Sequence, residues 1–203
     1  RSTLFPYTTL FRSPYRPTSR WPDTHIRYRY EGESGHVQFG VVLRDVGGFA
    51  DGLGEEHVFG IGASVAGSQQ IGSDYILFQG TYGKGIARYI QDLTGLGADV
   101  GVDENGKLEA NEAGSFYVAY QHYWKATLRS SFIYGYARVD SENKTFTTTF
   151  HDSTYTAANV IWNPADSSLN FGVELLWGEQ ELVTGATGDA TRLQVSFQYD
   201  LVK

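Results

Sequence analysis

The side chains best suited to binding chemistry in this sequence are cations on the polar side of segments where apolar and polar residues alternate. Arg is always charged, and its planar guanidinium matches a carboxylate, so several such groups around a passage favour anions. Two further cations, Lys84 and Arg88, stand at the beginning of a long glycine-containing segment. The candidate substrate-binding residues are Arg27, Arg29, Arg44, Lys84, Arg88, Arg129 and Arg192. In the alternative interpretation, these cations only neutralise Glu174, Asp200 or acids of the loops.

The sequence gives weaker indications of catalysis and of metal binding than of anion binding. None of the five histidines stands in a recognisable nucleophile motif with a serine and a carboxylate. The segment 101–112 has suitable residues at several positions of a calcium-binding loop, but Gly101 occupies the place of the first ligand and no flanking helices are evident. We therefore expect no catalytic residue, no metal site and no cofactor. The histidines are His25, His36, His57, His122 and His151.

Composition indicates an all-β chain. Its 203 residues include Gly 24, Tyr 14 and Phe 12, and rings pack well on pleated strands while glycine serves turns and close backbone approach. The absence of cysteine excludes a disulfide scaffold and a thiolate metal site. No run approaches the roughly 18 apolar residues of a spanning helix, so any membrane crossing would use strands. The formal net charge of -7 suggests repulsion of anions, yet most acids fall in loops or turns.

Alternation predicts about nine strands. The clearest is 191–201, where Leu193, Val195 and Phe197 lie on one face and polar residues on the other. A strand of about ten residues, tilted near 40°, covers roughly 25 Å of membrane height. Outward faces are nearly free of charge, which favours an antiparallel transmembrane β-barrel over a soluble sandwich with an aromatic core. The expected strands are 23–30, 36–44, 57–66, 74–82, 113–124, 127–139, 154–162, 168–177 and 191–201.

The connections between these strands alternate in length. Short turns at one rim and long loops at the other are typical of outer-membrane barrels and indicate the passage of solutes. We expect the longest loop, 85–112, to bend toward the interior and narrow it, with a loop outside the barrel as the alternative. The short connections are 31–35, 67–73, 123–127 and 163–168. The long ones are 45–56, 85–112, 140–153 and 178–190.

The first thirteen residues stand apart from this pattern. RSTLFPYTTLFRS reads like the forward translation of a short-read sequencing adapter, and such segments are excluded from fold reasoning. The chain also contains no methionine. We therefore expect 1–13 to be a non-native segment and 14–203 to be the C-terminal portion of a barrel domain whose beginning, with any signal peptide, lies upstream.

Several segments together resemble one family. RWPDTHIRYRYEG, GHVQFGVVLRDVG, TYGKGIARYIQDL, YQHYWKATLRSSFIYGYA, NVIWNP, LNFGVELLWGEQE and GDATRLQVSFQYD follow the order and spacing of the C-terminal half of a DcaP-like porin, a trimeric outer-membrane channel family of Gram-negative bacteria. One departure is that 200–203 follow Tyr199, where porins usually end on an aromatic residue.

The resemblance implies a sixteen-stranded barrel, of which this chain holds a part, with short turns in the periplasm and long loops outside. It also implies a homotrimer that lies among outer-membrane lipid and lipopolysaccharide and admits small anions such as carboxylates and dicarboxylates by passive diffusion through pore-lining arginines. No nucleic-acid partner is expected. The alternatives are an outer-membrane barrel enzyme, such as a lipid or ester hydrolase, and an adhesive or structural barrel.

Overall fold

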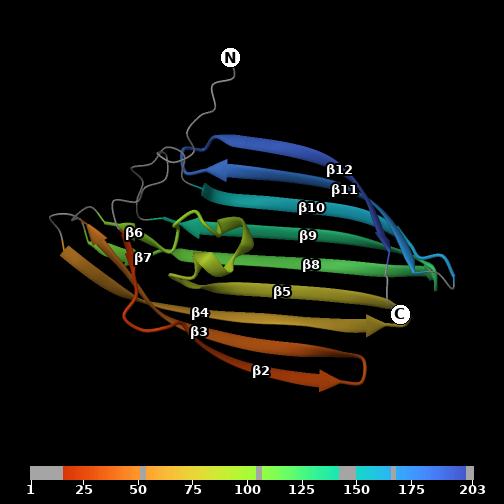
Figure 1. Cartoon of the computed structure of the whole chain (residues 1–203), viewed down its shortest axis with the longest axis horizontal. Coiled ribbons are helices and arrows are strands. Elements are labelled where there is room, and N and C mark those ends of the chain that lie inside the picture. The colour runs from red at the N-terminus through yellow and green to blue at the C-terminus, as the bar shows by residue number, and fades with distance from the viewer. Residues whose placement is uncertain (1–15, 51–53, 104–106, 142–149, 166–167, 200–203) are drawn as a thin grey trace, which may run out of the picture.

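The fold is one large antiparallel sheet with a small hairpin and a helical segment beside it (Figure 1). A computed structural model describes residues 16–50, 54–103, 107–141, 150–165 and 168–199. The ten-stranded sheet has the order β1-β3-β4-β5-β8-β9-β10-β11-β12, with β2 also paired to β3, and β6 pairs with β7 in a separate sheet. The predicted segment 1–13 lies outside the described residues.

Nine of the strands are long, as alternation predicted, and neighbours in sequence form hairpins. Short turns follow β2, β4, β8 and β10 at one rim, which confirms the existence of the four predicted short connections. The one predicted at 67–73 is only a turn at 72–73, because β4 runs to Ile71. The bounds of the long strands are β2 Thr24–Gly32, β3 Gly35–Ala50, β4 Gly54–Ile71, β5 Asp74–Lys84, β8 Glu112–Lys125, β9 Leu128–Asp140, β10 Phe150–Trp162, β11 Leu169–Leu182 and β12 Thr187–Tyr199. The remaining elements are β1 Arg16–Thr18, β6 Val100–Val102, β7 Leu108–Ala110 and the 3-10 helices η1 Ala87–Tyr89 and η2 Gln91–Leu93.

Two of the expected long loops are mostly strand. In the segment 45–56, β3 runs to Ala50 and β4 begins at Gly54. In 178–190, β11 runs to Leu182 and β12 begins at Thr187. The polar residues at these strand ends led us to expect loops. The backbone pairing nevertheless continues through them, as the register of β3 with β4 shows. Of the expected segment 140–153, residues 142–149 lie outside the described part.

The register divides the sheet into two faces. Residues directly opposite each other in an antiparallel pair share a face. Val42, Gly62, Gly83, Ala113 and Val139 are thereby linked across five strands and lie on one face, which we call the concave face. The residues next to each of these in sequence, such as Leu43 and Asp140, lie on the opposite face, which we call the apolar face.

Large apolar side chains are exposed on the apolar face. Phe39, Val173 and Phe197, which a soluble sandwich would bury, are 53%, 50% and 63% exposed. Within the described residues the only other sheet is the two-stranded β6-β7, so no second layer of strands covers this face. An apolar surface of this extent in a soluble protein would be unusual, whereas a barrel wall presents it to lipid. The outer strands β2 and β12 do not pair with each other, and the sheet is open.

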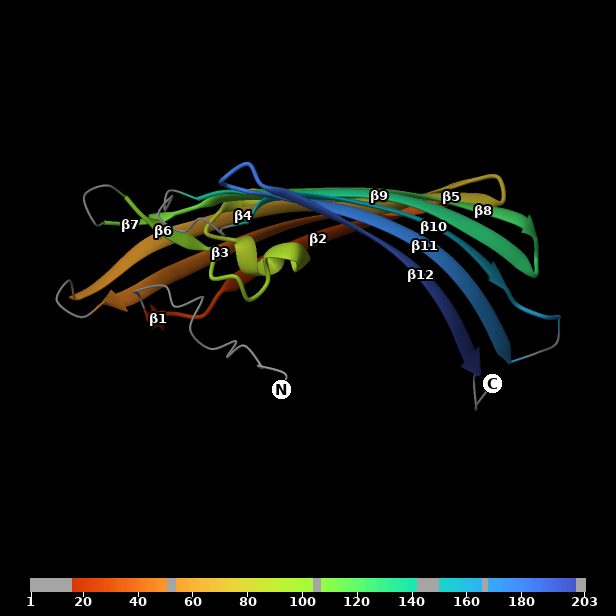
Figure 2. The same ribbon diagram turned by 90° about the horizontal axis from the view of Figure 1, so that it is seen from above.

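The buried core is small and lies on the concave face. Figure 2 shows the sheet bent over the helical segment between β5 and β8. The segment packs with Val42, Ala113, Ala137, Val139 and Phe150 of the sheet. Among the described residues, the structure has no helix with the length and apolar character needed to span a membrane.

Candidate functional site

The candidate site is the concave face together with the segment 85–112 that crosses it. Ile86, Ala87, Ile90 and Leu93 of this segment are almost completely buried against the sheet. Burial of each large aliphatic side chain contributes roughly 1.5–3 kcal/mol, so the three larger anchors, Ile86, Ile90 and Leu93, hold the segment firmly. The prediction that the segment turns inward, rather than extending outside, is confirmed by these contacts. That it narrows a pore stays a prediction.

Local sequence explains how the chain enters the concave face. Gly85 follows β5 directly and has φ 67°, a left-handed conformation that glycine adopts without strain. Its backbone N–H donates to the carbonyl of Asn111 at 2.9 Å, which closes the segment where β8 begins. On β4, Gly62 leaves room for Ile86, because a Cβ there would lie 2.8 Å from Ile86 Cγ2.

A buried arginine fastens the segment to β3. The Arg44 side chain is 3% exposed, and its Nε lies 3.0 Å from Asp23 Oδ2 while Nη1 lies 2.9 Å from Asp99 Oδ1. Arg44 also donates to the Gly85 carbonyl, and its guanidinium lies 5.3 Å from the ring centroid of Tyr89. One side chain of the sheet therefore binds three points of the inward segment. We call Arg44, Asp23, Asp99, Tyr89 and Arg88 the latch.

Arg88 and Tyr89 complete the latch from η1. The Tyr89 hydroxyl donates to Asp23, and His25 Nε2 lies 3.2 Å from the same hydroxyl. The guanidinium of Arg88 lies 3.7 Å from Asp23 and 3.8 Å from Asp99, and its side chain is 58% exposed. Two cations thus face two carboxylates. The latch is electrically balanced, and only Arg88 presents much of its charge to the concave side.

The electrostatics of Asp23 and Tyr89 follow from this arrangement. Burial alone would raise the pKa of Asp23, but the Tyr89 hydrogen bond and the charge of Arg44 outweigh it and hold that pKa below its usual value. Burial, together with the hydrogen bond to Asp23, raises the pKa of Tyr89 to about 12. Asp23 is therefore a carboxylate and Tyr89 a neutral donor at neutral pH.

The other predicted cations are distributed over both faces. Register pairs Arg27 with Gly40, Arg129 with Ile161 and Arg192 with Leu176, all on the concave face. Arg27 and Arg192 make no ion pair with a described residue. The Arg129 Nε is buried without a hydrogen-bond partner among the described residues.

Arg29 and Lys84 are each paired with a carboxylate. Arg29 also lies on the concave face but pairs with Glu31. Lys84 pairs in register with Ile61, which places it on the apolar face, where its Nζ lies 2.9 Å from Glu112 Oε1. Lys84 therefore lies on the opposite face from the candidate arginines of the strands, because the alternation of β5 extends through it, and a pore-lining role for these cations stays a prediction.

Arg44 pairs with an acid of a loop, Asp99, as the alternative interpretation of the cations allowed, but the sequence did not identify Asp23, Asp99 and Tyr89 as its particular partners. Asp23 could have been found, because a hairpin turning at 33–34 places it opposite Arg44, one position beyond the Thr24–Leu43 pair. Asp99 and Tyr89 come from an irregular segment, for which the sequence gives no register. The suggested alternative partner Glu174 accepts instead from Asn159 at 3.1 Å, and Asp200 lies outside the described residues.

Histidine contacts within the described residues do not complete a hydrolase triad. Ser68 Oγ lies 3.0 Å from His36 Nδ1, but no described carboxylate contacts that ring. Thr18 Oγ1 lies 3.5 Å from His57 Nε2, beyond the usual reach of a general base, and Glu55 occupies the same nitrogen at 2.9 Å. In the weak calcium-loop segment, Gly101 and Glu109 face each other in the β6-β7 hairpin, which is not a helix-flanked loop.

Comparison with known proteins bears on the fold. No model of a protein family matches this chain, and no curated protein matches it. Among solved structures, the crystal structure of the outer membrane channel DcaP of Acinetobacter baumannii matches with a TM-score of 0.76 at 18% sequence identity. The match covers 91% of this chain and 53% of that chain, so this chain spans about half the length of the channel. The likeness shows that the sheet has the fold of part of an outer-membrane channel.

Proposed function

We propose that this chain forms part of the wall of a channel in the outer membrane of a Gram-negative bacterium, through which small anionic solutes such as carboxylates and dicarboxylates diffuse passively. The observation that carries the proposal is the two-faced sheet. Its apolar face exposes aromatic and branched side chains, whereas its concave face carries arginines and an inward segment. A lipid-facing exterior and a polar interior have this arrangement. The fold shared with an outer membrane channel supports the same interpretation.

Anion preference rests on the concave-face arginines whose charge is not already matched. Arg44 and Arg29 are paired with carboxylates, so their charge is largely compensated. Arg27 and Arg192, which make no ion pair with a described residue, and the exposed Arg88 remain for solutes. A guanidinium in a confined passage favours carboxylates by charge and by bidentate hydrogen bonding.

The inward segment gives the channel its constriction in this proposal. It is fixed by buried anchors and by the latch, so its position is set by the sheet rather than by a solute. The orientation, with the short turns in the periplasm, and the homotrimeric state rest on the family resemblance. Lipid and lipopolysaccharide are the expected partners of the apolar face.

Reversal potentials across planar bilayers test the function. The channel that contains this chain is reconstituted under a KCl gradient, and we expect a reversal potential on the anion-selective side. Replacing Arg27 and Arg192 together by Ala shifts it toward cations. Lys84→Ala is the matched control and leaves it unchanged, because Lys84 lies on the apolar face. Absence of conductance contradicts the channel, and a preference for cations in the unaltered protein contradicts the anion pathway.

A further inference from the structure

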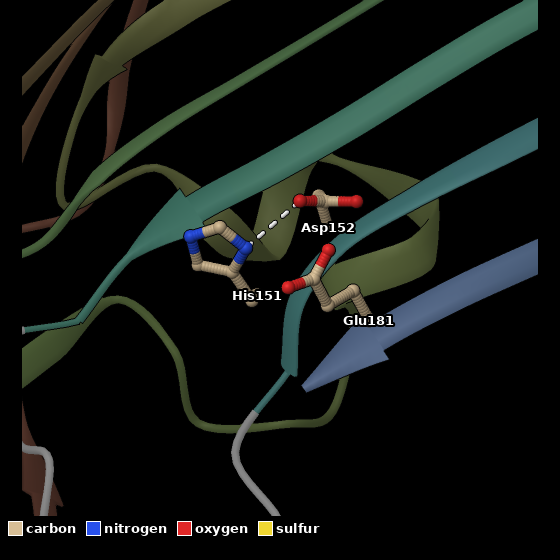
Figure 3. A group of neighbouring side chains, drawn as sticks. All are labelled: His151, Asp152 and Glu181. Carbon is tan, nitrogen blue, oxygen red and sulfur yellow. Dashed lines mark hydrogen bonds and ion pairs between the residues drawn. The ribbon is translucent and has the colours of Figure 1, made fainter. Parts of the chain in front are cut away.

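Strand β10 contains a β-bulge that gathers three metal-binding side chains away from the latch. Phe150 pairs with Leu182 and Asp152 pairs with Glu181, so His151 is an extra residue between the two pairs. A bulge sets two residues of one strand against a single residue of its partner and redirects a side chain. Figure 3 shows the result, with His151 and Asp152 beside Glu181.

The three side chains are close enough to share an ion. One ligand atom from each lies within 4.8 Å of the others, and His151 Nδ1 is 2.8 Å from Asp152 Oδ2. A tetrahedral metal with ligand bonds of about 2.0–2.2 Å holds its ligands roughly 3.4 Å apart, so side-chain movements of about 1 Å suffice. All three residues are half-buried, which limits the rotamer freedom that binding would remove.

The surrounding charge also favours a cation. Asp152 and Glu181 bring two carboxylates to the cluster, and Arg138 is the residue that pairs with Asp152 from β9. Arg138 instead donates to Asp140, through Nε at 3.0 Å and Nη2 at 2.7 Å. Arg138 therefore interacts mainly with Asp140 and less with Asp152, and its one positive charge leaves the group of Asp140, Asp152 and Glu181 net negative, which favours an added cation.

We propose that His151, Asp152 and Glu181 bind one divalent transition-metal ion of the zinc class. The imidazole favours such an ion over Mg²⁺ and Ca²⁺, which prefer ligand sets composed of oxygen alone. The ion takes the place of the hydrogen bond between His151 Nδ1 and Asp152 Oδ2, and water fills the remaining coordination positions. Because the ligands come from β10 and β11, the ion ties the two strands together at the rim opposite the short turns.

Calorimetric titration of the full chain in detergent micelles with ZnCl₂ tests the proposal. We expect one bound Zn²⁺ per chain, and a hundredfold excess of MgCl₂ should not displace it. Glu181→Gln, which keeps the side-chain shape, and His151→Ala should each weaken binding at least tenfold, because even an outer partner of a metal ligand changes affinity by about tenfold or more. Glu179→Gln is the control, since Glu179 is an exposed acid on the same strand outside the cluster.

The outcomes distinguish a specific metal site from weak binding at scattered acids. No saturable binding to the unaltered chain overturns the proposal, as does equal affinity in Glu181→Gln and the unaltered chain. Equal weakening by Glu179→Gln also overturns it, because that result describes general attraction to acids. Far-ultraviolet circular dichroism establishes that each variant keeps its strands. The visible absorption of Co²⁺, which changes with its coordination geometry, repeats the comparison with a second ion.

Discussion

Replacing Arg44 by Ala should release the inward segment from the sheet. The substitution removes a side chain that bonds Asp23 beside β2, Asp99 of the segment and the Gly85 carbonyl together, which no other side chain of the described residues does. Removing one partner of a buried ion pair costs about 3–5 kcal/mol, because the charges left behind are not compensated. Arg88 lies 3.7 and 3.8 Å from the same carboxylates and compensates them in part. We therefore expect the lower end, about 3 kcal/mol.

Two measurements follow this loss. Urea unfolding in detergent micelles gives the free energy of unfolding, and limited trypsin digestion reports whether the bond after Arg88 becomes accessible. Arg29→Ala is the control, because Arg29 and Glu31 form a pair whose side chains are 46% and 64% exposed, and such surface pairs contribute about 0–1 kcal/mol. A triple variant with Arg44→Met, Asp23→Asn and Asp99→Asn should regain part of the stability, since no buried charge is left uncompensated and the remaining cation, Arg88, is 58% exposed.

Two results would refute the role of the latch: Arg44→Ala costs no more than Arg29→Ala, or trypsin cleaves after Arg88 equally fast in the variant and the unaltered chain. Either result would mean that the apolar anchors alone hold the segment and that the latch contributes only alignment.

Three further predictions concern the same segment. Gly62→Val should expose the segment to trypsin and cost about 1–3 kcal/mol, because the new side chain meets Ile86; Gly80→Ala is the control, since its Cβ meets only a side chain at 3.9 Å. The lowered pKa of Asp23 contributes stability above its ordinary value of 3.8 that is lost as the pH falls through the folded pKa, so Asp23→Asn should flatten the acid side of the unfolding free energy. The raised pKa of Tyr89 contributes stability below pH 10 that is lost between pH 10 and about 12, and urea unfolding of Tyr89→Phe should lack this alkaline loss.

Strands and faces could be predicted from the sequence because their period is local. In β12, Val195 and Phe197 alternate with Gln194 and Ser196, and the structure keeps that division. The same rule placed Arg27, Arg129 and Arg192 on the concave face. Strand ends were harder to place, because the polar residues of 178–190 have the composition of a loop while their backbone groups pair as a strand.

The partners of Arg44 in the latch could be predicted from the sequence only in part. Asp23 lies opposite Arg44 through hairpin register, which can be counted from the turn at 33–34. Asp99 and Tyr89 reach Arg44 through an irregular segment, whose path depends on where Ile86, Ile90 and Leu93 find apolar contacts on the sheet. We predicted Lys84 to belong to this inward segment. The pairing of β5 continues through Lys84, however, and this pairing determines the face of the sheet on which its side chain lies. The bulge at His151 is likewise a feature of pairing that alternation alone does not predict.

We propose that the apolar face of the sheet meets lipid and that the concave face meets water. The chain contains no cysteine, so single cysteines can be introduced at adjacent positions of β9, Ser131→Cys on the concave face and Phe132→Cys on the apolar face. In lipid vesicles, a charged maleimide should modify cysteine 131 and leave cysteine 132 unmodified until detergent is added. Rapid modification of cysteine 132 in intact vesicles, with cysteine 131 protected, would contradict the assignment of the apolar face to lipid and of the concave face to water.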